Sequence, residues 1–76
     1  LVKVDSITLI RFGLTGTIPS TLGLLTTLTI LAIESNLVVG SIPSSIGNLT
    51  NMVYLYLYQN SLTGLYYSYD SMVIIL

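Results

Sequence analysis

The chain has 76 residues, of which 53% are hydrophobic and 7% charged, with a formal net charge of −1, no cysteine and no histidine. This length allows one small domain with a marginal core, and the lack of cysteine excludes disulfide bridges and thiolate metal sites. The lack of histidine removes the commonest metal ligand and general base, and so few charges offer no basic surface for nucleic acid. We therefore expect no cofactor, no metal and no nucleic-acid partner.

The high hydrophobic content raises the question of a membrane span, and the pattern of apolar residues argues against one. The longest candidate, LGLLTTLTILAI at 22–33, contains three threonines. It is also shorter than the roughly 20 apolar residues that a spanning helix needs. No basic segment precedes an apolar one at the N-terminus, so we expect that any signal sequence has been removed or that the chain is part of a longer one.

Self-similarity with a period of 24 residues organises the chain. Three segments align without a gap: ITLIRFGLTGTIPSTLGLLTTL from residue 7, LAIESNLVVGSIPSSIGNLTNM from 31 and LYLYQNSLTGLYYSYDSMVIIL from 55. The apolar columns of this alignment include Ile7, Leu31 and Leu55; Leu9, Ile33 and Leu57; Leu14, Val38 and Leu62; Leu25, Leu49 and Val73; and Leu28, Met52 and Leu76. One unit cannot bury its apolar stripe alone, so we expect the units to stack into a continuous core.

Each unit predicts a short strand followed by turns. The strands are expected at 7–10, 31–34 and 55–58, parallel and about 4.8 Å apart. Glycines at 16, 40 and 64 suit a backbone site with positive φ, and Pro19 and Pro43 suit an extended segment where a missing N–H is tolerated. The columns expected to face solvent are Ser6, Thr8 and Ile10; Ile30, Ala32 and Glu34; and Tyr54, Tyr56 and Tyr58.

The columns spell L-x-x-L-x-L-x-x-N-x-L-x-G-x-I-P-x-x-L-G-x-L, which resembles the plant-type extracellular leucine-rich repeat of receptor-kinase ectodomains and secreted inhibitor proteins. The resemblance covers the whole chain. It implies an α/β fold: a leucine-rich-repeat solenoid of about three coils, with a parallel β-sheet on the concave face and turns and 3-10 segments elsewhere. We expect one domain over 1–76, with coils at about 1–24, 25–48 and 49–72 and a partial coil at 73–76.

One column of the repeat is polar and is expected to be structural. In the resembling family an inward asparagine bonds the backbone of adjacent coils, and Asn36 and Asn60 occupy that column. Phe12 takes the same place in the first unit, where an apolar ring cannot make those bonds. We expect a defect there, with the first coil at an edge or covered by another chain, unless the ring simply packs.

The third unit departs from the pattern after Gly64. Tyr66 and Tyr67 stand where Ile-Pro is expected, and Asp70 takes an inward apolar column. Because an inward carboxylate is costly unless it is paired or solvated, we expect Asp70 to be a cap residue. The last coil is then either open to water or leaves the repeating path near residue 70, and VIIL at 73–76 resumes the apolar register.

Both ends of the array lack the caps that a solenoid needs, which in the resembling family are often cysteine-paired segments. Uncapped ends expose unpaired strand edges and apolar cross-sections. Two explanations stay open. The chain is an excerpt of a longer array, or copies of itself cover its ends by head-to-tail stacking, which builds a fibre when the contacts do not close.

Catalytic residues are hard to assemble from this sequence. A nucleophile would need Lys3 as its base, and Lys3 with Asp5 forms only a pair of charges near the chain start. We expect no enzyme. Arg11 and Glu34 fall on neighbouring predicted strands and are expected to form a surface ion pair, worth about 0–1 kcal/mol.

Two features point to recognition or modification at the surface. Asn48-Leu49-Thr50 is an acceptor sequence for an N-linked glycan, and the resemblance implies a secreted chain. Tyrosine supplies a large amphipathic contact area, which favours a ligand or self-association surface, although aromatic residues also simply suit strands. The candidate contact residues are Tyr54, Tyr56, Tyr58, Tyr66, Tyr67 and Tyr69.

We therefore expect a non-enzymatic structural or interaction module, extracellular or secreted, that binds protein. It would associate with copies of itself through its uncapped ends or its tyrosine face, forming a larger assembly or fibril. The alternative is a fragment of a receptor-like ectodomain that recognises a peptide or carbohydrate ligand on its concave face. An inhibitor of a secreted enzyme is compatible with the same sequence.

Overall fold

The computed structural model describes residues 4–63 and the backbone of 73–75. Its elements are β1 (Ser6–Thr8), the 3-10 turn η1 (Ser20–Leu24), β2 (Ile30–Ala32), β3 (Val39–Ser41), the 3-10 turn η2 (Ser44–Asn48), β4 (Tyr54–Tyr56), β5 (Ser61–Thr63) and β6 (Val73–Ile75). Both helical segments within these residues are 3-10 turns, so this part of the chain contains no α-helix. None of its helical segments has the length and apolarity to cross a membrane.

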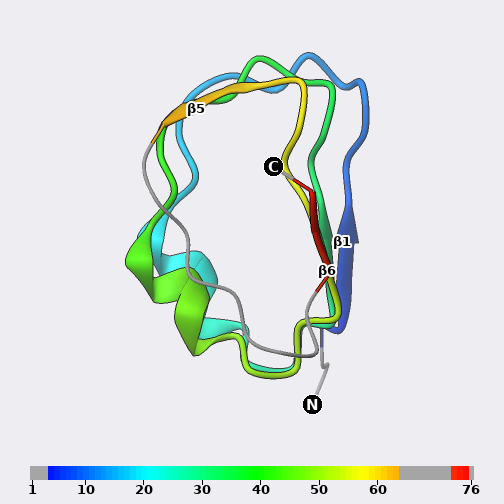
Figure 1. Cartoon of the computed structure of the whole chain (residues 1–76), viewed down its shortest axis with the longest axis vertical. Helices are drawn as coiled ribbons and strands as arrows, with labels where there is room; N and C mark the ends of the chain where they lie inside the picture. The colour runs from blue at the N-terminus through cyan, green and yellow to red at the C-terminus, as the bar shows by residue number, and fades with distance from the viewer. Residues whose placement is uncertain (1–3, 64–72, 76) are drawn as a thin grey trace.

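The strands form two parallel sheets, as Figure 1 shows. The larger sheet has the order β1-β2-β4-β6, and in it Ile7 lies opposite Leu31, which lies opposite Leu55. These partners are 24 residues apart, because each pass of the chain returns to the same side of the molecule. The prediction of short parallel strands is confirmed, although each begins one residue earlier than expected. The second sheet, β3-β5, was not predicted.

The core lies between the large sheet and the two 3-10 turns. Strand alternation sends Leu31 and Leu55 inward, and both are fully buried. The other large side chains that are fully buried are Leu28, Ile46, Leu49 and Met52. Full burial of such a side chain contributes about 1.5–3 kcal/mol, so these six residues supply much of the stability of the fold.

Proline begins both 3-10 turns. Pro19 and Pro43 have extended backbones, with φ of −72° and −62°, and each lies directly before its turn. Their carbonyl oxygens accept the first turn bonds, from Leu22 N and Ile46 N at 3.1 Å each. The prediction of 3-10 segments between the strands is confirmed, and the proline that cannot donate a hydrogen bond sits where none is required.

Close packing between η1 and η2 requires a glycine at position 23. A Cβ atom there would lie 2.5 Å from the backbone oxygen of Ser45, a distance that real Cβ atoms do not show. Gly16 and Gly40, one on each pass of the chain, have φ of 87° and 86° and fit their glycine column for a different reason. That backbone conformation is one that side chains with a Cβ rarely adopt.

The third pass breaks the 24-residue spacing. Val73 lies opposite Tyr54, only 19 residues further along the chain. The gapless alignment that placed Val73 in the column of Leu25 and Leu49 is therefore wrong at this point. The third unit lacks the Ile-Pro pair that precedes each 3-10 turn in the first two, so its sequence carries no signal that would hold the 24-residue spacing.

Candidate functional site

The tyrosine stripe consists of Tyr54, Tyr56 and Tyr58, which alternate along β4 and the residues after it. Leu55 and Leu57 are buried on the core side, so the tyrosines face the other way. The Tyr54 and Tyr56 rings stack with centroids 5.8 Å apart, and Tyr56 meets Tyr58 edge-on at 6.4 Å. Such pairs add about 0.5–1.5 kcal/mol beyond burial. Tyr54 and Tyr58 remain 40% and 36% exposed, so the stripe is preorganised and accessible at both ends.

The stripe does not lie on an edge strand. β4 pairs with β2 on one side and with β6 on the other, with Tyr56 opposite Ala32 and Ile75. Besides the three strands expected at 7–10, 31–34 and 55–58, the large sheet has a fourth, β6, where the sequence predicted only that the apolar register resumes. Tyr66, Tyr67 and Tyr69, and also Asp70, lie outside the described residues.

Two neighbours of the stripe are buried, although both were predicted to face solvent. Ala32 is small and lies opposite Tyr56, whose larger side chain rises beside it on the same face. Glu34 continues the same register next to Tyr58, since Ser35 N donates to Tyr58 O at 3.0 Å. The prediction of solvent-facing Ala32 and Glu34 is wrong, because it took account of strand alternation and not of the size of the neighbouring side chains.

Glu34 also does not form the predicted surface ion pair. Its side chain is 7% exposed, and its Oε2 atom has no hydrogen-bond partner among the residues that the structure describes. Arg11, by contrast, is exposed and has φ of 60°, which turns the backbone away from the strand direction. The ion pair is therefore absent because one partner is buried and the other points into solvent.

The Asn36 side chain connects two passes of the chain. Its Nδ2 donates to the backbone oxygens of Leu9 and Ile33 at 2.7 and 2.8 Å. Its Oδ1 accepts hydrogen bonds from the backbone nitrogens of Phe12 and Leu14 at 3.0 and 3.2 Å. The Asn36 amide thus supplies hydrogen-bond partners to backbone groups between Leu9 and Leu14, which follow β1 and belong to no strand.

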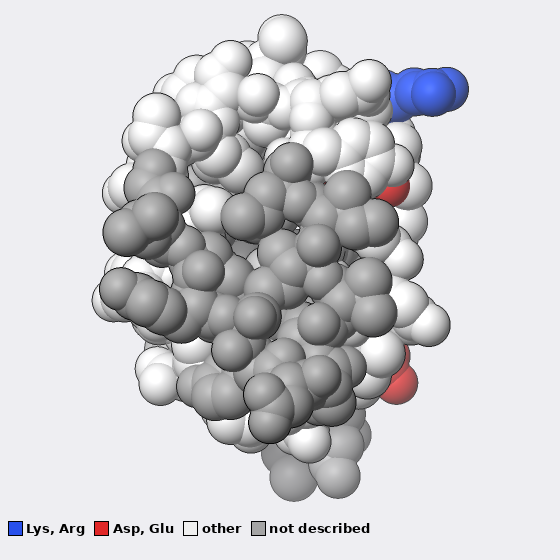
Figure 2. Space-filling model, viewed as in Figure 1, with Lys and Arg blue, Asp and Glu red and all other residues white. Residues whose placement is uncertain are grey.

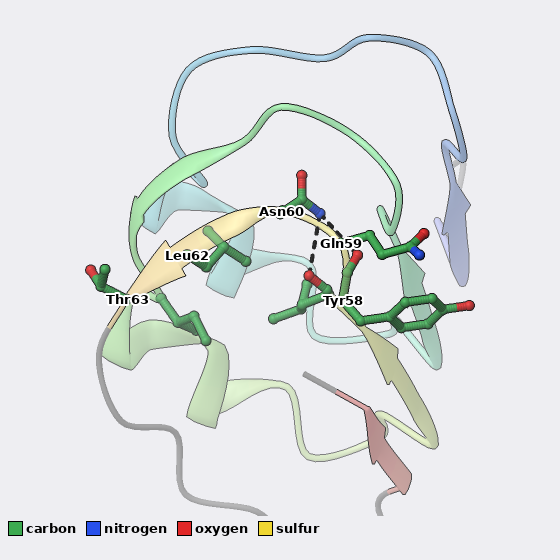
Figure 3. Close-up of a pocket in the computed structure, with 7 residues that line it drawn as sticks. Tyr58, Gln59, Asn60, Leu62 and Thr63 are labelled. Atoms are coloured by element: carbon green, nitrogen blue, oxygen red, sulfur yellow. Dashed lines mark hydrogen bonds between the residues drawn. The ribbon is translucent and has the colours of Figure 1, made fainter.

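Asn60 repeats this arrangement on the next pass. Its Nδ2 donates to Ile33 O at 2.9 Å and to Leu57 O at 3.2 Å, and its Oδ1 accepts from Val38 N at 2.9 Å. Figure 3 shows Asn60 at the start of β5, directly before Ser61. Both asparagines use their full side chains on the backbone, so their role is structural.

Phe12 occupies the asparagine column of the first pass, and its ring lies outside the core. It is 68% exposed, the highest exposure of any aromatic residue in the described chain. Only its backbone takes part in the column, as a donor to Asn36 Oδ1. Of the two explanations for Phe12, packing into the core is wrong, and an edge position agrees with the exposed ring.

Hollows occur beside two different parts of the described chain, one next to β1 and the other next to β5. The β1-side hollow has a volume of about 250 Å³ and is lined by Ile7, Leu9, Leu14, Thr15, Thr17, Ile18, Pro19, Leu22, Leu31, Ile33 and Val38. The β5-side hollow, of about 210 Å³, is lined by Ile42, Leu57, Tyr58, Gln59, Asn60, Leu62 and Thr63. Tyr58 belongs to both the stripe and the lining of the β5-side hollow, so the two adjoin at this residue. In Figure 3 its ring extends away from Leu62 and Thr63.

The described surface carries few charges. In Figure 2 the coloured atoms are confined to one side of the view, and the remaining described surface is white. No group of three or more Asp, Glu, His or Cys side chains that could hold a metal ion occurs among residues 4–63 and 73–75. The charged residues of 4–63 are Asp5 and Arg11, which are exposed, and Glu34, which is buried, so most of the described surface consists of aromatic, apolar and uncharged polar groups.

Asn48, the predicted glycan acceptor, is accessible. It is the exposed last residue of η2, and Thr50, also exposed, donates its backbone N–H to Asn48 O at 3.0 Å. The acceptor sequence thus lies on a turn at the surface, away from the tyrosine stripe. Nothing in the packing of these residues blocks attachment of a glycan.

Comparison of the sequence with models of known protein families, and with curated proteins, found no match. The function is therefore inferred from the residues and their geometry. Two features of that geometry had no sequence signal: the burial of Glu34, and a left-handed backbone at Arg11, Ser35 and Gln59. These three residues lie 24 apart, but none is a glycine, so the column was not recognisable.

Proposed function

We propose that the chain is a leucine-rich-repeat solenoid of about three coils, similar to the plant-type extracellular family, and a non-enzymatic structural or interaction module. The 24-residue register of β1, β2 and β4 supports this, as do the two proline-initiated turns. The amide bonds of Asn36 and Asn60 across successive passes agree with the same architecture. Repeats of this kind stabilise one another through neighbour contacts and present extended surfaces for binding.

The observation that carries the functional proposal is the apolar β1-side hollow. Leu9 is 39% exposed there, whereas its column partners Ile33 and Leu57 are buried. β1 ends the order of the large sheet, so its outer edge is unpaired among the described residues. An apolar cross-section beside an open strand edge is a template for association, and we propose that a second copy covers it head to tail.

Light scattering over a dilution series tests this assembly. We expect the chain to form oligomers or fibres, visible by electron microscopy, that dissociate on dilution. Leu9→Gln, which places a polar amide in the hollow, is expected to weaken assembly. Leu24→Gln changes a more exposed leucine on η1 that does not line the hollow, and it is expected to assemble normally. A monomer at every concentration contradicts the proposal.

We also propose an extracellular or secreted location, with a glycan at Asn48. The exposed acceptor on η2 supports this, and the low charge of the described surface does not oppose it. Mass spectrometry of chain secreted from eukaryotic cells should show added hexosamine at Asn48. Thr50→Ala, which removes the acceptor hydroxyl, should abolish the mass increase, and an unmodified wild-type chain contradicts this part of the proposal.

A second candidate function is recognition of a peptide or carbohydrate ligand by the tyrosine stripe. The stacked and half-exposed rings favour it, because they offer contact area whose order is already fixed in the free chain. Screening against peptide and glycan arrays identifies a ligand, and replacing Tyr54, Tyr56 and Tyr58 with serine is expected to remove its binding. A circular dichroism spectrum that stays unchanged shows that the fold is retained, and unchanged binding contradicts this function.

A further inference from the structure

Glu34 carries the one buried side-chain nitrogen or oxygen atom of the described residues that has no hydrogen-bond partner. The residue is 7% exposed, and its Oε2 atom is buried without a hydrogen-bond partner. Burial of a carboxylate costs far more than burial of a neutral polar group unless a cation or donors offset it. Unsatisfied buried groups of this kind are rare in folded proteins and call for an explanation.

The position of Glu34 connects it to the tyrosine stripe. Ala32 lies opposite Tyr56, and the bonds from Ile33 N to Tyr56 O and from Ser35 N to Tyr58 O, each at 3.0 Å, continue this register, so Glu34 lies opposite Tyr58. Strand alternation places it on the same face as their rings. Tyr58 is exposed and Tyr56 half-buried, so a ligand that contacts these rings lies on the same face as the buried Glu34 side chain.

The described chain supplies no cation of its own to this carboxylate. Arg11 is the only lysine or arginine within residues 4–63, and its side chain is exposed. Its left-handed backbone, with φ of 60°, takes it away from the strand direction that Glu34 follows. The negative charge therefore remains available to a cation from outside.

We propose that Glu34, Tyr56 and Tyr58 form a binding site for a cationic side chain, lysine or arginine, of a partner peptide or protein. The carboxylate pairs with the cation, and the tyrosine rings contact its apolar stem and its charged head. A sugar hydroxyl can bond the carboxylate but leaves its charge buried, so charge complementarity selects a cationic peptide. The site rests on the second function proposed above, recognition at the tyrosine stripe.

Two matched peptides test the site: acetyl-Gly-Arg-Gly-amide and its neutral counterpart acetyl-Gly-Gln-Gly-amide. Titrated into isotope-labelled chain and followed by NMR, the arginine peptide is expected to shift the amide resonances of 33–35 and 56–58. Its affinity should exceed that of the glutamine peptide by at least about tenfold, equivalent to about 1.4 kcal/mol. Equal affinity of the two peptides, or no binding of either, overturns the proposal.

Glu34→Gln is the isosteric variant, which keeps the shape of the side chain and removes its charge. It is expected to keep the circular dichroism spectrum of the wild type and to lose at least about tenfold in affinity for the arginine peptide. Tyr58→Leu is a second variant, at an exposed position, and it should weaken binding because the aromatic face is gone. Full affinity in either folded variant overturns the site.

The main competing explanation for the unpaired Glu34 carboxylate is that Arg11, the one lysine or arginine within residues 4–63, pairs with it in solution. If it closes onto Glu34 in solution, Arg11→Gln will lower the urea midpoint of the wild type and leave that of Glu34→Gln unchanged, and this result overturns the proposal. We expect Arg11→Gln to have the same small effect in both. The array screen with the serine variants of the stripe tests ligand recognition by the tyrosines independently of Glu34. The cation site can therefore be disproved while ligand recognition by the stripe is supported.

Discussion

Asn36 and Asn60 donate hydrogen bonds to the same backbone oxygen, that of Ile33, at 2.8 and 2.9 Å. A carbonyl oxygen has two lone pairs, and the two side chains use both. The amides therefore form a continuous ladder along the stack, in which each asparagine also bonds the pass before it. Loss of one amide removes hydrogen bonds from the backbone of two passes, so we expect the ladder to contribute substantially to the stability of the fold.

Asn36→Ala is expected to destabilise the chain strongly. The change leaves the backbone nitrogens of Phe12 and Leu14 and the oxygen of Leu9 without their side-chain partner. We expect a loss of about 2–4 kcal/mol, because an unsatisfied group costs about 1–3 kcal/mol when fully buried and less at these three part-buried positions. Urea unfolding followed by circular dichroism measures it.

Phe12→Asn is the control for this prediction. It restores the amide to the column at a place where the ring is exposed and no earlier described pass lies beside it. Its effect should stay within about 0.5 kcal/mol, as is usual at the surface. If Asn36→Ala is as mild as this control, the ladder is not a main source of stability.

Gly23→Ala tests the close approach between the two 3-10 turns. The added methyl group would lie 2.5 Å from the backbone oxygen of Ser45, which cannot move like the end of a flexible side chain. We expect η1 and η2 to separate, at a cost of about 1–3 kcal/mol. Leu24→Ala, at the next position and mostly exposed, should cost less than about 0.5 kcal/mol in the same urea experiment.

Periodicity predicted the positions of the strands because burial in this fold is set by columns that repeat along the chain. Leu31 and Leu55 are fully buried where alternation placed them, and the turns begin at Pro19 and Pro43. The column rule failed at Val73, where the repeat motif was already lost. A regular pattern thus predicts architecture for as long as its turn residues persist.

The candidate site was less predictable than the fold, because it depends on the sizes of neighbouring side chains. Alternation places Glu34 on the face that carries the tyrosines, and it does not predict that the Glu34 side chain is only 7% exposed there. The predicted pairing with Arg11 failed for a backbone reason, a φ of 60° at a residue that is not glycine. Neither effect has a signature in a single sequence.

Arg11→Asn is expected to stabilise the chain slightly. Arg11 holds a left-handed backbone, which costs about 1–2 kcal/mol for most residues and less for asparagine. Arg11→Ala removes the same exposed side chain without this conformational preference and is the matched control. Asparagine should exceed alanine in unfolding free energy by about 0.5–1 kcal/mol, and equal values would show that the left-handed backbone carries no strain.

Leu9 and Leu57 occupy the same column and differ in burial. Substitutions at these two positions therefore distinguish the stability of a single chain from the stability that an assembly adds. Leu57→Ala removes a buried side chain and should cost about 2–5 kcal/mol at every protein concentration. Leu9→Ala should cost less in dilute solution, because Leu9 is already partly exposed in the β1-side hollow.

If copies cover this hollow, the unfolding midpoint of the wild type should rise with protein concentration, because association stabilises the folded state by mass action. Leu9→Ala should then reduce that rise, whereas Leu24→Ala should leave it intact. Thermal unfolding midpoints measured across a hundredfold range of protein concentration decide between the outcomes. When association is saturated, this range stabilises the folded state by about 2.7 kcal/mol. A wild-type midpoint independent of concentration would mean that the hollow stays open to solvent between separate chains.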